Sequence, residues 1–466
     1  MGRTRWMVVV ICVALLAAAC GRSGDSKADS ASSTTRTTGA TAGSADFGSL
    51  TNVCQPGDAS AATAKGPTAQ GVTDGEIRIA TFSDAGYSGR PGLNQELFDT
   101  TEVFSKWCNA AGGINGRKIV VDERDAALTN YKPKILESCA QDFFMVGGGA
   151  VFDNTGVPDR LKCLLPDVAA YVVTPEARGA DLLVQPLPNP IDRMFIGEYR
   201  WLGKKYPATT DHVGILTGNL PTTVTVAKQA KEAVESLGWK VVYDDQYPAA
   251  GPTDWSPYVQ GMKDKGVQGL IWIGEPENLA KLQQGMANAN YSVSWIRTDV
   301  NHYDKRLIDV GGPAVENTYM PSSFAPFEDA SKNPATQQYL DAFAKYKPGA
   351  KTRAALGIQA WSAWLLFAQA ARDCGADLTR KCVYTNAKRI HDWTGGGLHA
   401  PTDPGNNRGS RCFVMLKADA NGFSTVDVGA NDGIYSCSDK NGYVLKGDYG
   451  TGVTLAGVGK SINDLK

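Results

Sequence analysis

One pattern occurs twice in this chain of 466 residues, and it restricts the fold more than any other feature. Residues 116–122, GRKIVVD, are echoed by residues 238–244, GWKVVYD. A second shared run follows each of them, TNYKP at 129–133 and TDWSP at 253–257. We therefore predict two structural halves that are built on one plan.

The plan alternates strands with helices. Short apolar runs are typical of buried strands, and between them apolar residues recur at helical spacing. Leu97, Phe104 and Ala111, for example, mark a helix that Gly112 and Gly113 end. The predicted strands are residues 77–82, 119–121, 144–146 and 169–173 in the first half, and 213–216, 241–243 and 270–273 in the second. Continuous apolar strands alternating with amphipathic helices indicate parallel sheets covered on both faces, so we expect an α/β fold with two doubly wound lobes.

The N-terminus has the features of an export signal. Arg3 and Arg5 precede an apolar run at 7–16, and the small residues 17–19 lead to Cys20. This arrangement resembles a bacterial lipoprotein signal peptide of residues 1–19, which implies that Cys20 carries acyl chains. The alternatives are an ordinary secretory signal or a single membrane span, although a span needs about 20 apolar residues.

The segment after the signal has a distinctive composition. Residues 21–46 are mostly Ser, Thr, Ala, Gly and Asp, so we predict that residues 20–71 form a lipid-anchored flexible tether and N-terminal segment. The formal net charge of −1 does not indicate a nucleic-acid partner. We expect the protein on the extracytoplasmic face of a bacterial cell membrane, attached through the lipid.

Eight of the ten cysteines remain once the signal and the lipid site are set aside, and an oxidising compartment favours four disulfides. A zinc site is the rival, but the chain has no Cys-x-x-Cys and its histidines show no ligand spacing, so no metal or cofactor is expected. Cys374 and Cys382 flank a polar turn after a helix, and Cys412 and Cys437 lie on two apparent neighbouring strands. We pair each within its set, and the other four cysteines depend on the fold.

Catalytic motifs are incomplete throughout the chain. The run at 86–90 lacks the last glycine of Gly-x-Ser-x-Gly, and Gly459-Lys460-Ser461 has Thr454 where a P-loop needs its first glycine. The triple glycine at 147–149 does not continue as Gly-x-Gly-x-x-Gly. We therefore predict that the protein is not an enzyme.

Three runs carry a family resemblance, GVTDGEIRI at 71–79, NAAGGINGRKI at 109–119 and WTGG at 393–396. They resemble type I periplasmic binding proteins, and most closely the leucine/isoleucine/valine-binding group that serves ABC transporters. The resemblance implies a clamshell of two lobes with three crossings between them. Lobe one would comprise residues 72–187 plus 325–405, lobe two residues 188–322 plus 412–445, and residues 446–466 would form a C-terminal tail.

The resemblance also bears on the remaining cysteines. In that fold the strand order 2-1-3 places the helices that carry Cys139 and Cys163 on one face of lobe one. The helix that carries Cys108 lies on the other face. We therefore expect the pairs Cys139–Cys163 and Cys54–Cys108.

Ligands of doubly wound sheets bind at the carboxyl ends of the strands. The polar and aromatic residues in those loops are the ligand-binding candidates: Ser83, Asp84, Tyr87, Asp153, Asn154 and Thr174 in lobe one, Asn219, Glu275 and Asp299 in lobe two, and Phe324 at a crossing.

The resemblance implies an amino-acid ligand, with Asp299 as the partner of its ammonium group and Glu275 or Asp84 as rivals. The family usually holds the carboxylate with a small Ser/Thr-rich loop, but this chain has Phe152 and Asp153 there, which fit a carboxylate poorly. A cationic, amide-like or polyol ligand is therefore an alternative.

The function expected from these features is that of an extracytoplasmic solute-binding lipoprotein. It would capture a small polar ligand between its lobes by hinge closure and deliver it to an ABC permease. The alternative is a ligand-sensing receptor that signals to a membrane partner.

Overall fold

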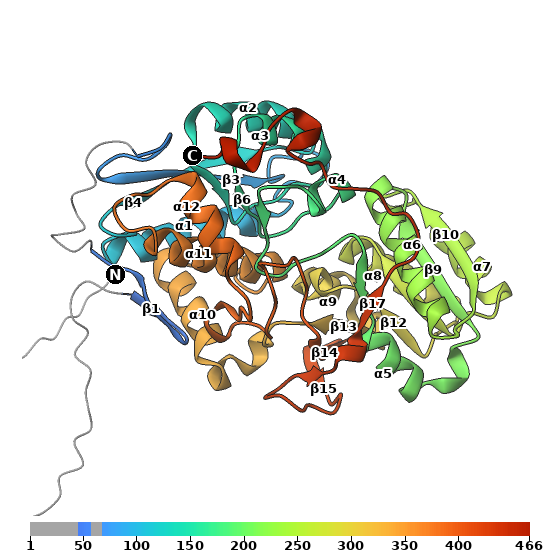
Figure 1. Cartoon of the computed structure of the whole chain (residues 1–466). Coiled ribbons are helices and arrows are strands. Elements are labelled where there is room, and N and C mark those ends of the chain that lie inside the picture. Colours follow the sequence, from blue (N-terminus) through green and yellow to red (C-terminus); the bar gives the residue numbers. More distant parts are fainter. Residues whose placement is uncertain (1–44, 57–67) are drawn as a thin grey trace, which may run out of the picture. The chain divides into compact units, whose positions relative to one another are not determined.

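The computed structural model describes residues 45–56 and 68–466 (Figure 1). The predicted signal peptide, the lipid site Cys20 and most of the tether lie outside the described residues. Within the described residues, no helix combines the length and the apolar character needed to cross a bilayer.

The first sheet is parallel and has the strand order β4-β3-β5-β6-β7. Its strands are β3 (Glu76–Ser83), β4 (Lys118–Asp125), β5 (Phe144–Val146), β6 (Asp167–Val168) and β7 (Leu183–Val184). The predicted order 2-1-3 is confirmed, but the strand predicted at 169–173 is wrong because the sheet ends at Val168. Beyond it, the Val173 amide donates to the Asp153 carboxylate instead of a neighbouring strand.

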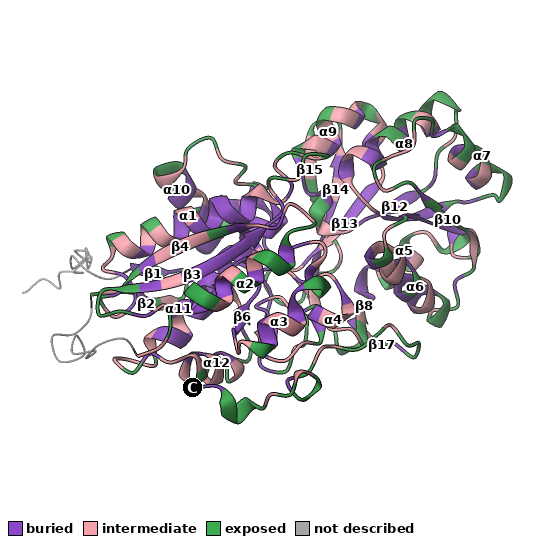
Figure 2. Cartoon of the chain, turned by 90° about the horizontal axis from the view of Figure 1, so that it is seen from above, coloured by how far each residue is buried: buried purple, intermediate pink, exposed green. Residues whose placement is uncertain are grey.

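Alternating strand residues build the two faces of this lobe. Ile77 and Ile79 are buried in the cluster that contains α1 and α11, whereas Ala80 and Phe82 are buried on the opposite face. Figure 2 shows the strands buried between helices whose outer surfaces are exposed. The helices are α1 (Gln95–Ala110), α10 (Pro334–Tyr346), α11 (Ala355–Arg372) and α12 (Arg380–Lys388), and across the sheet α2 (Tyr131–Gln141) and α3 (Val157–Lys162), with the short α4 (Pro175–Arg178) following.

The second sheet has the order β10-β9-β11-β12-β13-β14-β15, and β16 also pairs with β14. Its strands are β9 (Val213–Gly218), β10 (Val241–Tyr247), β11 (Gly269–Ile273), β12 (Trp295–Arg297), β13 (Thr318–Ser322), β14 (Cys412–Asp419), β15 (Gly422–Val426) and β16 (Ser436–Cys437). The first five strands in this order are parallel, as expected. β14 pairs antiparallel with β13, where the chain re-enters the lobe, and β15 pairs antiparallel with β14.

Helices cover both faces of the second sheet as well. Residues of α5 and α6 share a buried cluster with Val213 and Ile215, and residues of α7 and α8 share another with Leu216 and Trp272. These helices are α5 (Gly197–Lys205), α6 (Pro221–Ser236), α7 (Ser256–Asp264), α8 (Pro276–Asn288) and the shorter α9 (Lys305–Gly311). The repeated sequence runs occupy equivalent positions, because β4 and β10 both pair with the first strand of their own sheet.

The GGINGRK run forms a tight turn between α1 and β4. Gly113 has a φ of +81°, and a Cβ there would lie 2.0 Å from the Arg117 carbonyl oxygen, so only glycine fits. The buried Arg117 guanidinium donates to the carbonyl oxygens of Thr73 (3.0 Å) and Ala376 (3.1 Å). This motif therefore holds lobe one together and lies outside the ligand cavity described below.

Four disulfides tie the fold, and they are the four pairs expected from the sequence. Their Cα–Cα distances are 5.3 Å for Cys54–Cys108, 5.7 Å for Cys139–Cys163, 6.0 Å for Cys374–Cys382 and 4.0 Å for Cys412–Cys437.

The segment predicted as a flexible tether is partly folded. β1 (Ala45–Phe47) and β2 (Leu50–Cys54) form an antiparallel hairpin. Phe47 is buried against Trp107 and Trp361, and the disulfide to Cys108 holds the second strand. Aromatic packing and the disulfide thus order the part of residues 20–71 that follows the composition-based tether of residues 21–46.

The segment predicted as a C-terminal tail also packs onto the protein. β17 (Gly442–Val444) pairs with β8 (Arg193–Phe195), and Glu232 of α6 accepts hydrogen bonds from the amides of Lys446 and Gly447. The chain then continues along lobe one (Figure 1, red), where Leu455 and Leu465 are buried with residues of α3. Residues 446–466 therefore contact both lobes.

Candidate ligand-binding site

A cavity of about 640 Å³ lies between the two sheets and is lined by residues of both lobes. Lobe one contributes the loop after β3, residues 171–173 and the N-terminal end of α11. Lobe two contributes the N-terminal ends of α6 and α8 and the residues around the end of β12. Most of these segments follow the carboxyl ends of strands, as expected for doubly wound sheets.

Glu275 and Asp299 are the two predicted site residues that line this cavity. Glu275 is the N-cap residue of α8 and forms an ion pair with Arg90 of lobe one. Burial raises the pKa of the Glu275 carboxyl above its ordinary value, although Arg90 opposes the shift. Glu275 is therefore already engaged by a cation of the protein.

Ser83 and Asp84 lie below the cavity and bind the backbone of lobe one. The two Asp84 carboxylate oxygens accept hydrogen bonds from the amides of Leu128 (2.7 Å) and Val151 (2.8 Å). The Ser83 hydroxyl donates to the Asn94 carbonyl oxygen at 2.9 Å. Their polar groups join loops of lobe one, and neither residue is among those that line the cavity.

Asp153 and Thr174 satisfy each other inside lobe one. The Asp153 carboxylate accepts hydrogen bonds from the Val173 amide (2.7 Å), the Thr174 amide (3.1 Å) and the Thr174 hydroxyl (2.5 Å). Burial raises the pKa of Asp153 to about 6. Asp153 is buried and is not among the residues that line the cavity, so its carboxylate does not contact a ligand bound there.

The other four predicted site residues also lie outside the cavity lining. Phe324 is buried against Tyr303, with ring centroids 6.3 Å apart, and Asn219 accepts a hydrogen bond from the Ala249 amide at 2.9 Å. Asn154 is exposed and Tyr87 is half-buried, each in a loop of lobe one. The pattern of strand ends indicated the correct edge of each sheet but did not indicate which loop residues face inward.

Arg297 lines the cavity and was missed by the sequence analysis. It is the last residue of β12, and its Nε and Nη2 atoms donate to one carboxylate oxygen of Glu198, at 3.1 and 2.6 Å. Glu198 lies on α5 and is fully buried. The sequence feature that could have indicated Arg297 is its position at the end of an apolar strand, two residues before the predicted site residue Asp299.

Asp299 is held near Arg297 by local contacts. Its Oδ1 atom accepts a hydrogen bond from the Asn301 amide (2.8 Å) and lies 3.6 Å from the His302 Nδ1 atom. Burial opposes ionisation, but the contact with His302 holds the pKa of Asp299 below its ordinary value. The carboxylate side chain remains 41% exposed and faces the cavity as a charged group.

Lobe one contributes a group of apolar side chains to the cavity wall, namely Leu93, Val151, Val172, Val173 and Leu356. The Asn94 side-chain amide nitrogen, on the same wall, donates to the Tyr171 hydroxyl at 2.7 Å. Charged side chains of lobe one also line the cavity, namely Arg90, Glu96, Arg178 and Lys351. The cavity therefore presents charged groups on both lobes and an apolar patch on lobe one.

Two sets of ion pairs cross between the lobes at this cavity. Arg90 contacts both Glu275 and Glu277, and Lys351 lies 2.7 Å from the Asp304 carboxylate. Arg90 and Lys351 are separated from their partners by long stretches of sequence, so no local pattern could have indicated these contacts. They hold the lobes together around the cavity.

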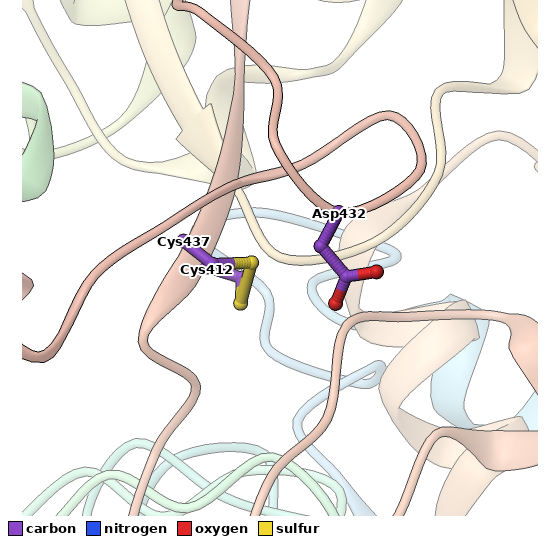
Figure 3. Close-up of side chains that lie close together, drawn as sticks. All are labelled: Cys412, Asp432 and Cys437. Atoms are coloured by element: carbon purple, nitrogen blue, oxygen red, sulfur yellow. A yellow bond between two sulfur atoms is a disulfide. The ribbon is translucent and has the colours of Figure 1, made fainter.

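One group of side chains in the described residues has the spacing of a metal site, namely Cys412, Asp432 and Cys437 (Figure 3). The two sulfur atoms are bonded to each other in a disulfide, so neither is a thiolate. A single carboxylate remains, which is insufficient for a structural zinc site. The arrangement therefore gives no support for a metal.

Comparison with known proteins agrees with this architecture. Residues 200–423 match the sequence profile of the periplasmic binding protein family. The match covers a little under half of the chain, and together with the solved structures below it supports the type I periplasmic binding protein fold. A comparison with curated protein sequences found no match.

Several solved structures share the fold. A fatty acid ABC transporter substrate-binding protein from Thermomonospora curvata has a TM-score of 0.67 and 18% identity, over 81% of this chain and 95% of that one. A leucine-binding protein from Thermotoga maritima has a TM-score of 0.62 and 14% identity, over 75% and 98% of the two chains. A branched-chain amino acid transporter substrate-binding protein from Streptococcus pneumoniae, in complex with isoleucine, has a TM-score of 0.58 and 16% identity, over 75% and 99%.

Proposed function

We propose that this protein captures a small carboxylate-bearing solute between its lobes and delivers it to an ABC permease. The observation that carries the proposal is the composition of the cavity. Arg297 and Asp299 place opposite charges on lobe two, while lobe one offers an apolar patch that includes Val172 and Val173. A ligand that touches both lobes binds the closed form more tightly and shifts the population toward it.

An amino acid is the ligand class we favour. Its ammonium group would pair with Asp299, whose carboxylate is charged and open to the cavity. An aliphatic side chain would pack on Val172 and Val173. The proteins of similar fold from Thermotoga maritima and Streptococcus pneumoniae are described as leucine-binding and as isoleucine-bound, which supports this class.

A fatty acid is the second candidate ligand. The apolar wall of lobe one favours it, and the similar protein from Thermomonospora curvata is described as a fatty acid transporter component. Such a ligand lacks an ammonium group and leaves Asp299 without a partner. Asp299 therefore favours the amino acid.

Thermal-shift measurements with purified protein test this function. A bound ligand stabilises the folded state by RT ln(1 + [L]/Kd), so the melting temperature should rise with ligand concentration. We expect a rise with branched-chain amino acids and a smaller one with amides, amines or fatty acids. Small-angle scattering should then show a smaller radius of gyration with the stabilising ligand. If no carboxylate-bearing compound raised the melting temperature, the proposed ligand class would be contradicted.

We further propose that lobe one, residues 72–187 plus 325–405, and lobe two, residues 188–322 plus 412–445, move as the two rigid parts. Cys20 would attach the protein to the membrane through its acyl chains. In the producing bacterium, Cys20→Ser should abolish palmitate labelling and release the protein from the membrane fraction. Continued labelling of that variant would contradict the anchor.

A further inference from the structure

The surroundings of Arg297 suggest more than a structural ion pair. The residue is only 9% exposed, yet it lines the cavity. Its Nε and Nη2 atoms both donate to the same oxygen of Glu198. Within residues 45–56 and 68–466, no acceptor is found for its Nη1 atom. The guanidinium is thus fixed on one side and retains donors for a further acceptor.

Glu198 and Tyr199 allow this charge to remain at a buried position. Glu198 is an adjacent carboxylate with no exposure, and the Tyr199 ring lies 5.1 Å from the guanidinium carbon. An unpaired buried arginine would be strongly unfavourable, whereas a paired and stacked one is tolerated. The pair therefore holds a cation in a defined orientation at the cavity wall.

The N-terminal end of α6 lies at the same cavity. This helix of 16 residues begins after Leu220 without a side-chain cap, and Thr222 and Thr223 line the cavity. The free amides of a helix N-terminus attract negative charge, which adds to the effect of Arg297.

The cations of lobe one are less suited to this role. Arg90 is already engaged by Glu275 and Glu277, and Lys351 by Asp304. Arg178 is bound to the carbonyl oxygens of Asn189 and Pro190. The Tyr171 hydroxyl on this wall already accepts a hydrogen bond from Asn94.

We propose that Arg297, supported from behind by Glu198, binds the carboxylate of the ligand. Both charged ends of an amino acid would then bind lobe two, with the carboxylate at Arg297 and the ammonium group at Asp299. Lobe one would close over the side chain and select for its apolar character. This inference rests on the proposed function and adds the position and orientation of the ligand.

The test compares three ligands that share the isobutyl side chain of leucine, measured by calorimetry on the wild-type protein. The ligands are L-leucine, 4-methylpentanoate, which lacks the ammonium group, and 3-methylbutylamine, which lacks the carboxylate. We expect leucine to bind about 10- to 100-fold more tightly than 3-methylbutylamine, the range for a charge-assisted hydrogen bond. Equal affinities for these two ligands would overturn the assignment.

The decisive variant replaces both members of the pair, as Arg297→Gln with Glu198→Gln, so that no buried charge is left alone. We expect it to lose about 10- to 100-fold in leucine affinity while its affinity for 3-methylbutylamine is unchanged. The ratio of the leucine affinity to the 3-methylbutylamine affinity would thus fall about 10- to 100-fold. A purely structural role for the pair does not predict this fall. Circular dichroism should show a folded variant, and Arg297→Lys offers a second variant that keeps the charge but loses the forked donors.

Arg200→Gln is the matched control. Arg200 lies on α5 with Glu198 but is exposed and outside the cavity lining, and the substitution removes the same charge. Its affinity ratio should equal that of the wild type. If the wild type binds neither leucine nor 4-methylpentanoate, the ligand class fails and this inference fails with it. If the wild type binds leucine but the double variant keeps the affinity ratio, only the assignment of Arg297 fails.

Discussion

Replacing Leu465 by alanine should destabilise the folded protein by about 2–3 kcal/mol, in the lower half of the range for buried leucine truncations. Leu465 is only 1% exposed and packs in a cluster with Leu161, Leu182 and Leu455. The removed side chain loses its burial and leaves a cavity. The lower half of the range applies because the neighbouring Val453 is only partly buried and can move into the space.

Urea unfolding followed by tryptophan fluorescence measures this change as a lower midpoint at an unchanged slope. Ile462→Ala is the matched control, because Ile462 belongs to the same segment but is 47% exposed. It should change the free energy of unfolding by no more than about 0.5 kcal/mol. If both variants unfold at the same urea concentration, the packing of residues 446–466 on lobe one is refuted.

Three further predictions concern the bridges, the pH response and the site. Replacing Cys54 and Cys108 together by alanine opens a loop that spans 54 positions. The gain in chain entropy of the unfolded state should lower the free energy of unfolding, measured in urea, by about 4 kcal/mol; an unchanged free energy of unfolding would contradict this prediction. Burial lowers the pKa of His399 to about 4 in the folded state, so the unfolded state binds more protons between about pH 4 and 6.5 and stability falls as pH falls through this window. His399→Gln should lack this pH-dependent contribution to stability. The difference in free energy of unfolding between the wild type and this variant should shrink by about 3 kcal/mol between pH 7 and 4; a difference that stays constant would show that the His399 pKa is not lowered. Asp299→Asn should weaken leucine binding by about 1.5–3 kcal/mol in calorimetry without a change in melting temperature of the free protein; unchanged affinity would show that Asp299 does not pair with the ammonium group.

The sequence by itself determined the architecture. Strand and helix periodicities are local properties, so the pattern of the chain alone was enough to assign the runs around Ile77 and Val213 to parallel sheets. Two of the cysteine pairs followed from the family resemblance, whose strand order implies that Cys139 and Cys163 lie on one face and Cys108 on the other. The repeated run at residues 116–122 and 238–244 also lies at equivalent positions, because it leads into the edge strands β4 and β10.

The inward-facing side chains of the cavity were decided by the tertiary structure alone. Strand ends indicated the loops, but Asp84 and Asp153 accept hydrogen bonds from backbone amides of other loops and do not line the cavity. Arg297 could not be distinguished from an ordinary surface arginine until Glu198, 99 positions away in the chain, lay behind it. A ligand site depends on contacts between segments far apart in the chain and on which polar groups the protein has already satisfied, and neither quantity is carried by local sequence pattern.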